Sequence, residues 1–522
     1  MAPTSVPIVP LTLDDIQGNI FGGFNKDFQA NLFLQFTSAA AGRAWIGEVS
    51  DEISDSSGSN VIEFNNEFKR LKKQGVTKPE ALIRAVWVNL AISFQGLTML
   101  NVKATDLVNF PAAFSAGMAG RKTEIGDVGA SDPSHWIPPF DKPKNVHAVL
   151  IIAADHPGQL QNRLDAITGS AAFKAGVQML LNQPGKTRSD LPGHEHFGFK
   201  DGISQPGVRG VDPPDDSTGN PNQGHPGQDL LWPGEFVIGY NTQIPTINAS
   251  GVSPNPEPGP ISESGPSWTV NGSYLVFRRL RQDVPAFEQN VHTLSKQLGL
   301  SFDLTGAKLV GRYKSGCPIE KTQFHPEPYT PPSNDPGDSY HGNAFLATSN
   351  TLNNNFEFED DQQGAICPMS AHIRKAYPRD EFTPGGAPPN RPEDSESSTQ
   401  TRRLLRRGIP YGEPFVPHDP ASAKVDRGLL FLAYQNDIQK HFEFVQHAWV
   451  DNANFPPNPP GQPPLKANPG EDPIISQSPS GNMLVDAAKP PVSINHFVTT
   501  TGGEYFFSPS ISALQDIGSG KI

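Results

Sequence analysis

The order strand–helix–strand recurs in both halves of this 522-residue chain, and this recurrence constrains the fold more than any other feature. Short apolar runs bounded by turn residues predict buried strands over 28–37, 86–94, 145–155, 271–284, 428–435 and 502–510. Apolar residues at helical spacing predict helices over 158–167, 286–300 and 438–449. No glycine-rich phosphate loop follows the first strand of either half, so we predict an α+β fold whose sheets are covered by helices on one face.

A change of composition near residue 210 predicts the boundary between two lobes. The chain contains 53 Pro and 49 Gly, and many of them lie in long polar loops. These loops cover 211–228, 249–266, 325–343, 380–400 and 452–472. We therefore predict an N-terminal lobe over residues 1–210 and a C-terminal lobe with long loops over 211–522.

Charge and hydropathy exclude several classes of partner. The formal net charge of −13 disfavours nucleic acid and anionic lipid. No apolar run approaches the roughly 18 residues that span a membrane, and the first residues lack the pattern of a secretory signal. We predict a soluble protein, either cytoplasmic or secreted as a processed chain. The only cysteines, Cys317 and Cys367, are predicted to be free buried thiols, with one disulfide as the alternative.

Asp201 lies between glycines in the stretch GFKDGISQP, residues 198–206. Glycines accept unusual backbone dihedrals and allow the backbone to approach another group closely. Asp201 is therefore a candidate functional carboxylate held in a tight turn. The alternative is a plain Asx-type turn, in which the carboxylate bonds only its own backbone.

His372 lies in AICPMSAHIRKAYPRD, residues 365–380, among small and apolar residues and directly before basic ones. An isolated neutral imidazole beside cations suits a haem, because the iron takes an axial nitrogen and the propionates take arginines. Arg374 and Arg379 are the candidate cofactor-binding cations. The alternative is an ordinary buried or capping histidine.

Two further stretches carry candidate chemistry. TRRLLRRGIPYGEPF, residues 401–415, places four arginines around two leucines, so that either one arginine points inward as a fixed cation or the stretch is a solvated basic face. His194 and His196 flank Glu195 and raise the alternative of a zinc hydrolase. A catalytic zinc needs three protein ligands, and no further ligand cluster lies near them in the sequence.

Six motifs, taken together and in this order, give the chain a family resemblance. They are LDDIQGNIFGGF (13–24), GFKDGISQP (198–206), GRYKSGCPI (311–319), AHIRK (371–375), LLRRGIPYG (404–412) and GGEYFFSPSI (502–511). The pattern resembles the dye-decolorizing peroxidases, a haem family, and in particular their longer fungal and bacterial members. The resemblance implies two ferredoxin-like α+β lobes, of the dimeric α+β barrel type, with haem in the C-terminal lobe.

The resemblance also implies roles for individual residues. Asp201 corresponds to the distal acid, His372 to the axial ligand of the haem iron, and Arg406 to the distal arginine, with the adjacent Arg407 as its rival. Asp472 is expected behind the imidazole, and Leu429 and Phe431 of the strand over 428–435 are expected to contact the cofactor. Tyr411 and Trp449 stand where related chains relay electrons to the surface, and two packing aromatics are the alternative.

The function implied is a peroxidase with one haem b per chain, which uses hydrogen peroxide to oxidise dyes and phenols by one-electron steps. A carboxylate such as Asp201 can take the proton from the inner oxygen of peroxide and return it to the outer one. A permanently charged arginine can stabilise the departing oxygen. A haem-binding carrier or sensor is the alternative function; it would need His372 and the arginines but would have no use for Asp201.

Overall fold

The computed structural model describes most of the chain. The described residues are 7–76, 82–215, 220–245, 257–322, 353–358, 361–381, 396–457, 467–477, 481–485 and 489–522. The predicted loop over 325–343 lies outside them. Parts of the predicted loops over 211–228, 249–266, 380–400 and 452–472 lie outside them as well.

The N-terminal half forms a four-stranded antiparallel sheet in the order β4-β1-β3-β2. Its strands are β1 (Phe28–Phe36), β2 (Val86–Ser93), β3 (Ala148–Ala154) and β4 (Val177–Lys186). The principal helices between them are α2 (Ala39–Ser54), α3 (Gly58–Lys73), α7 (Pro157–Gly169) and α8 (Ala171–Gly176). This β-α-β-β-α-β connection with strand order 4-1-3-2 is the ferredoxin-like arrangement.

The C-terminal half repeats the arrangement in the order β13-β7-β10-β8, with β9 also paired to β10. Its strands are β7 (Ser273–Gln282), β8 (Leu405–Arg406), β9 (Ile409–Tyr411), β10 (Gly428–Gln435) and β13 (Val498–Ser508). Helix α9 (Val284–Leu298) follows β7, and the π-helical segments Gln439–Glu443 and Val445–Val450 follow β10.

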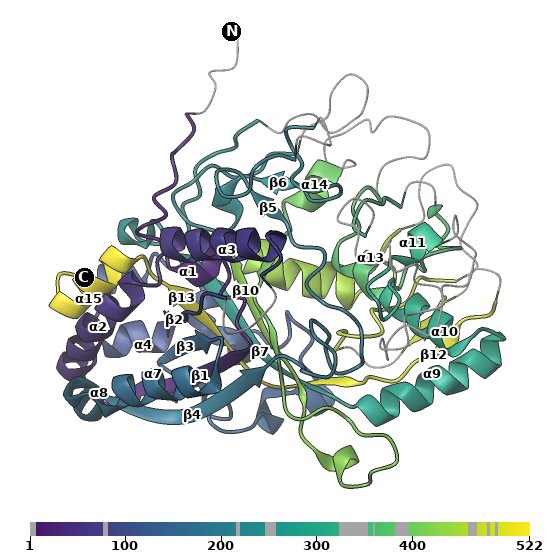
Figure 1. The fold of residues 1–522 in the computed structure, drawn as a ribbon, viewed down its shortest axis with the longest axis horizontal. Coiled ribbons are helices and arrows are strands. Elements are labelled where there is room, and N and C mark those ends of the chain that lie inside the picture. Colours follow the sequence, from purple (N-terminus) through teal and green to yellow (C-terminus); the bar gives the residue numbers. More distant parts are fainter. Residues whose placement is uncertain are drawn as a thin grey trace.

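Shorter elements surround the two half-sheets. The helices are α1 (Gly18–Phe21), α4 (Phe94–Met99), α5 (Ala104–Leu107), α6 (Ala112–Gly120), α10 (Phe302–Val310), α11 (Ile319–Thr322), α13 (His372–Ala376), α14 (Glu396–Gln400) and α15 (Ile511–Ser519). The strand pairs are β5 (Gly207–Val208) with β6 (Leu230–Leu231), and β11 (Asn482–Met483) with β12 (Val492–Ser493). Helices α2, α8 and α15 lie at one end of the molecule, and α9, α10 and α13 lie toward the other (Figure 1).

The two half-sheets join into one nine-stranded sheet, because β13 pairs with β7 on one side and with β2 on the other. The ends of the path also meet, since Gly185 of β4 packs on Ile409 of β9 so closely that a Cβ there would lie 2.5 Å from the isoleucine side chain. Aromatic rings fill the interior: the ring of Phe33 on β1 lies 4.8 Å from that of Phe277 on β7. The sheet therefore curls into an α+β barrel in which β4 meets β9 through side-chain packing.

The predicted fold class is confirmed, and the ends of each predicted strand lie within four residues of those of an observed strand. The predicted helix over 438–449 differs in type, because its backbone forms π-helical hydrogen bonds. The boundary near residue 210 stays a prediction. Cys317 and Cys367 are both buried and are not joined by a disulfide, as predicted. Among the described residues, no helix combines the length and the apolar character needed to cross a membrane.

Candidate active site

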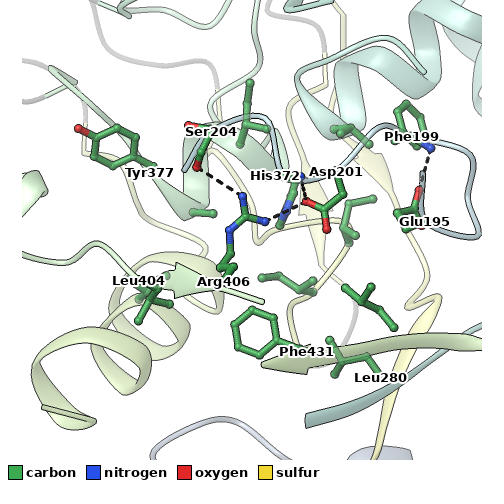
Figure 2. A pocket seen from close by; sticks show the side chains of 18 of the residues that line it. Glu195, Phe199, Asp201, Ser204, Leu280, His372, Tyr377, Leu404, Arg406 and Phe431 are labelled. Atoms are coloured by element: carbon green, nitrogen blue, oxygen red, sulfur yellow. Dashed lines mark hydrogen bonds and ion pairs between the residues drawn. The ribbon is translucent and has the colours of Figure 1, made fainter. Parts of the chain in front are cut away.

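A deep cavity lies on one face of the C-terminal half of the sheet (Figure 2). Alternate residues of two strands line it: Arg278, Leu280 and Gln282 from β7, and Leu429 and Phe431 from β10. Successive side chains of a strand point to opposite faces, so this spacing places all five on the same face. The two residues predicted from the strand over 428–435 therefore lie at the cavity wall.

Helices and a loop complete the cavity. α13 contributes His372 and Ile373, α10 contributes Val310, and the π-helical segments contribute Phe442 and Val445. The loop over residues 195–204, which carries the candidate carboxylate, lines it as well. The cavity is thus enclosed mainly by apolar side chains, with a small set of charged groups directed into it.

His372 is the first residue of α13 and is held by a carboxylate from a distant segment. Its Nδ1 donates to Oδ2 of Asp472 across 2.8 Å, while Oδ1 of Asp472 accepts from the backbone N–H groups of Ile474 and Ile475. The carboxylate of Asp472 is fully buried. Burial lowers the pKa of His372, but the charge and hydrogen bond of Asp472 outweigh it and raise that pKa. Among the described residues, the other ring nitrogen of His372, Nε2, has no hydrogen-bond partner.

Asp201 and Arg406 form an ion pair in the same cavity, with 2.9 Å between Oδ1 and Nη1 (Figure 2). The turn that carries Asp201 requires glycine, because Gly198 and Gly202 have φ values of 90° and 76°. Oδ1 of Asp201 also accepts from the Gly202 backbone N–H at 2.6 Å. The carboxylate therefore does bond its own turn, as in the plain turn hypothesis, but it also holds a cation.

The pKa of Asp201 is lowered from its ordinary value. Burial raises it, but the charge of Arg406, the Gly202 N–H and the hydrogen bond from Arg406 together lower it further than burial raises it. Gln205 holds the backbone of Arg406: its amide donates to the Arg406 carbonyl and accepts from the Arg406 N–H. The pair thus presents an ionised carboxylate and a fixed cation to the cavity.

Arg407, the alternative to Arg406 in the sequence analysis, points away from the cavity. Its guanidinium donates to the carbonyls of Asn19, Ile20 and Phe21 at the end of α1. It does not line the cavity, whereas Arg406 does. Of the two adjacent arginines, only Arg406 is in contact with Asp201.

Of the two arginines predicted to bind the cofactor, Arg379 lines the cavity and Arg374 does not. The Arg374 guanidinium is fully buried away from the cavity, where it pairs with Glu381 and Asp361. A buried cation needs such partners, so Arg374 serves the local structure.

In addition to Arg278 of β7, three cavity arginines were not predicted from the sequence: Arg312, Arg402 and Arg403. Arg312 lies in the GRYKSGCPI motif and the other two in TRRLLRR, so the motifs pointed to the right segments but not to these side chains. Arg312 is 4% exposed, and burial, followed by the charge of Arg379, lowers its pKa to about 9. The cavity therefore carries several buried cations in addition to Arg406.

Tyr411 and Trp449 are buried and lie outside the cavity lining. The Tyr411 hydroxyl donates to Asp426, and Arg279 covers its ring at 4.2 Å. Trp449 stacks on Phe455 with 5.5 Å between ring centroids.

His194, Glu195 and His196 do not converge on a common point. Both ring nitrogens of His194 bond backbone carbonyls, and Nε2 of His196 bonds the Tyr411 carbonyl. Glu195 accepts from the backbone N–H groups of Phe197 and Phe199. Within the part of the chain that the structure describes, no cluster of three or more such side chains is arranged to hold a metal ion. The geometry therefore gives the zinc alternative no support.

Comparison with known proteins defines the class of this barrel. Residues 15–189 match the model of the DyP dimeric alpha+beta barrel domain, and residues 389–455 match that of the C-terminal part of Dyp-type peroxidases. A solved ancestral D-type dye decolorizing peroxidase superposes with a TM-score of 0.76 at 33% identity, covering 98% of this chain and 100% of that one. The fold is thus that of an α+β barrel peroxidase.

Two curated relatives extend the match along the chain. A dye-decolorizing peroxidase from Mycetinis scorodonius is 32% identical over 97% of this chain and 88% of its own. One from Auricularia auricula-judae is 33% identical over 98% of this chain and 87% of its own. The chain belongs to the dye-decolorizing peroxidase family and is a peroxidase, as its motifs predicted, and this family depends on haem.

Proposed function

We propose that the cavity binds one haem b, with Nε2 of His372 as the axial ligand of its iron. The observation that carries the proposal is that one cavity holds an imidazole with a free nitrogen together with a carboxylate–arginine pair. Asp472 fixes the tautomer, because a hydrogen bond from Nδ1 leaves the lone pair on Nε2.

The donor set of the cavity fits a haem. Apolar side chains such as Leu280, Leu429 and Phe431 suit the faces of a porphyrin, and the cavity arginines suit its carboxylates. Arg312, Arg379 and Arg403 are the candidate propionate partners. When bound, the haem would supply the two-electron reduction of peroxide and the oxidising equivalents that donors then remove.

Asp201 and Arg406 have the properties that peroxide chemistry requires of a distal pair. An ionised Asp201 can take a proton from one oxygen of hydrogen peroxide and deliver it to the other. Arg406 is charged at every working pH and can stabilise negative charge on the departing oxygen. A protein that only carried or sensed haem would gain nothing from this pair.

We propose that the donors are bulky aromatic dyes and phenols. Donors too large to enter the cavity would be oxidised at the surface, through Tyr411 or Trp449. In support of this route, Tyr411 bonds Asp426, whose side chain is 53% exposed. Packing aromatics remain the competing interpretation for both residues.

The test is the ultraviolet–visible spectrum of the purified protein before and after one equivalent of peroxide. We expect a haem band that changes on addition of peroxide, and loss of most haem in His372→Ala. His292→Ala is the matched control, because His292 is exposed on α9. A haem band that does not change on addition of peroxide would favour a haem carrier or sensor. Full haem retention in His372→Ala would refute His372 as the axial ligand.

A further inference from the structure

Tyr377 lines the cavity but takes no part in the roles proposed for Asp201, Arg406 and His372. It caps the C-terminus of α13, the helix that begins with His372, and it lines the cavity while only 8% exposed. Its backbone N–H donates to the Ile373 carbonyl, so the helix fixes its position relative to the imidazole. Figure 2 shows its hydroxyl turned away from the cavity.

Behind the ring, the hydroxyl meets two carboxyl groups. It lies 2.8 Å from Oδ2 of Asp229 and 3.2 Å from Oε1 of Glu396. A phenol carries one proton and can donate to only one of them, so the second contact needs a proton on the carboxyl group. Burial and the charge of Asp229 raise the pKa of Glu396 to about 8, which identifies Glu396 as the protonated partner.

Asp229 is then the group that accepts from the phenol, and a cation pairs with the same carboxyl group. Nη1 of Arg403 lies 3.2 Å from Oδ2 of Asp229, the oxygen that also accepts from Tyr377. One hydrogen bond therefore joins the Tyr377 hydroxyl to a carboxyl group that also pairs with an arginine.

Two cations lie over the tyrosine ring. The guanidinium carbon of Arg403 is 3.8 Å from the ring centroid, and that of Arg379 is 5.4 Å away. Cations at the face of the ring repel a positive charge on it. Oxidation of Tyr377 to a radical cation is thus disfavoured, and only oxidation with simultaneous loss of the proton is open to it.

We propose, on the basis of the proposed haem peroxidase function, that Tyr377 is a redox-active residue of this cavity. In the step, the phenolic O–H bond breaks, the proton forms an O–H bond on Oδ2 of Asp229, and one electron passes to the peroxide-oxidised cofactor. A neutral tyrosyl radical remains. One electron from an organic donor and return of the proton from Asp229 restore the phenol, so that atoms and electrons balance over the cycle.

The experiment is electron paramagnetic resonance of the haem-loaded protein, frozen within milliseconds of adding one equivalent of peroxide. Ring-deuterated tyrosine identifies a tyrosyl signal by its narrowed hyperfine pattern. We expect the signal to disappear in Tyr377→Phe and to persist in Tyr434→Phe. Tyr434 is the matched control, because it is fully buried and hydrogen-bonded to Asn19 and Asn89 but does not line the cavity.

Asp229→Asn tests the proton acceptor and does not depend on how Tyr377→Phe folds. An asparagine oxygen still accepts the phenolic hydrogen bond but is too weak a base to take the proton. Since a positioned base contributes about 10²–10⁴ in rate, we expect the tyrosyl yield to fall at least about tenfold.

Full tyrosyl yield in either Tyr377→Phe or Asp229→Asn overturns the proposal, and so does loss of the signal in Tyr411→Phe alone. The optical spectrum of the same samples separates this failure from that of the proposed function. A protein without a peroxide-responsive haem band refutes both proposals, whereas a responsive band with no tyrosyl signal refutes only the role of Tyr377.

Discussion

Asp472 divides its two oxygens between the backbone of its own turn and the ring of His372, which is 100 positions away in the sequence. Because the turn holds Oδ1, the direction of Oδ2 is fixed. The hydrogen bond to Oδ2 then fixes the orientation of the imidazole ring. A carboxylate that orients an imidazole must itself be held, and here the backbone of residues 474 and 475 holds it.

The first prediction concerns this contact. In Asp472→Asn the amide oxygen keeps the two backbone bonds, which turns the amide N–H groups toward His372 and removes the acceptor for its Nδ1–H. We expect haem affinity to fall about 10–100-fold, measured as transfer to apomyoglobin. Asp451→Asn is the control, because Asp451 bonds Gln446 and Gln477 and makes no contact with His372. Equal haem retention in both variants would contradict the prediction.

The distal pair carries the second prediction. Asp201→Asn and Arg406→Leu should each slow the reaction with peroxide by about 10²–10⁴ while haem stays bound, because one removes the base and the other the charge stabiliser. Stopped-flow absorbance measures the rate constant. Arg407→Leu should react at the normal rate but melt at a lower temperature, since it leaves three backbone carbonyls without their donor. A slow Arg407→Leu with a normal Arg406→Leu would reverse the assignment.

The third prediction is an acid optimum for dye oxidation, at about pH 3–5. The base acts only when ionised, and the pKa of Asp201 is lowered, so Asp201 remains active further into acid than an ordinary aspartate. Arg406 supplies part of that lowering. Arg406→Leu removes that contribution and should raise the pKa of Asp201. The acidic limb of the pH–rate profile should therefore move to higher pH, and the rate should fall as well. A limb at the same pH in both proteins would show that Asp201 is not the titrating base.

The relay hypothesis makes a separate prediction about donor size. Replacement of both Tyr411 and Trp449 by Phe should reduce turnover of a bulky dye and spare that of a small phenol, which can enter the cavity. Steady-state rates with the two donors, at equal haem content, measure the effect. Equal retention of both activities would leave the two residues as packing aromatics.

A fifth prediction concerns stability. Glu504 is buried on β13, and burial raises its pKa to about 7, although the N–H groups of Met118 and Tyr505 bond its carboxyl. A raised pKa means that the folded state binds the proton more tightly, so stability is lost as the pH rises from about 4.5 to 7.

Glu504→Gln keeps an oxygen for both N–H groups and carries no charge at any pH. We therefore expect the variant to melt a few degrees above the parent at pH 8 and at nearly the same temperature at pH 4.5. Calorimetric melting curves at the two pH values measure this. A variant that melts lower at pH 8 would show that the carboxylate is stabilising.

Local pattern was sufficient for most of the fold. The strands β1, β3 and β10 are short apolar runs buried on both faces, and α9 carries apolar residues at helical spacing, so each could be located from its own residues. The π-helical segments could not, because their type depends on how a helix adapts to its neighbours rather than on periodicity. Pairing of β13 with both β7 and β2 is likewise a non-local property.

The candidate site divides in the same way. The segments around Asp201, His372 and Arg406 could be identified because they carry family motifs. Which arginine of a pair faces the cavity depends on strand register, a one-residue distinction that flips a side chain to the other face. The direction of Arg374 could not be predicted for a related reason: its carboxylate partners, Asp361 and Glu381, determine it, and they carry no signal of that role in the sequence.

The position of β13 has a consequence for biosynthesis. This strand completes the sheet between β7 and β2, and its Val498 lines the cavity, yet it comes from residues 498–508. The N-terminal strands leave the ribosome several hundred residues earlier, with the edge of β2 uncovered. The pocket is incomplete until translation has passed residue 508. We therefore expect haem insertion to follow synthesis of nearly all of this sequence, and a nascent chain stalled before that point should neither retain haem nor cover its β2 edge.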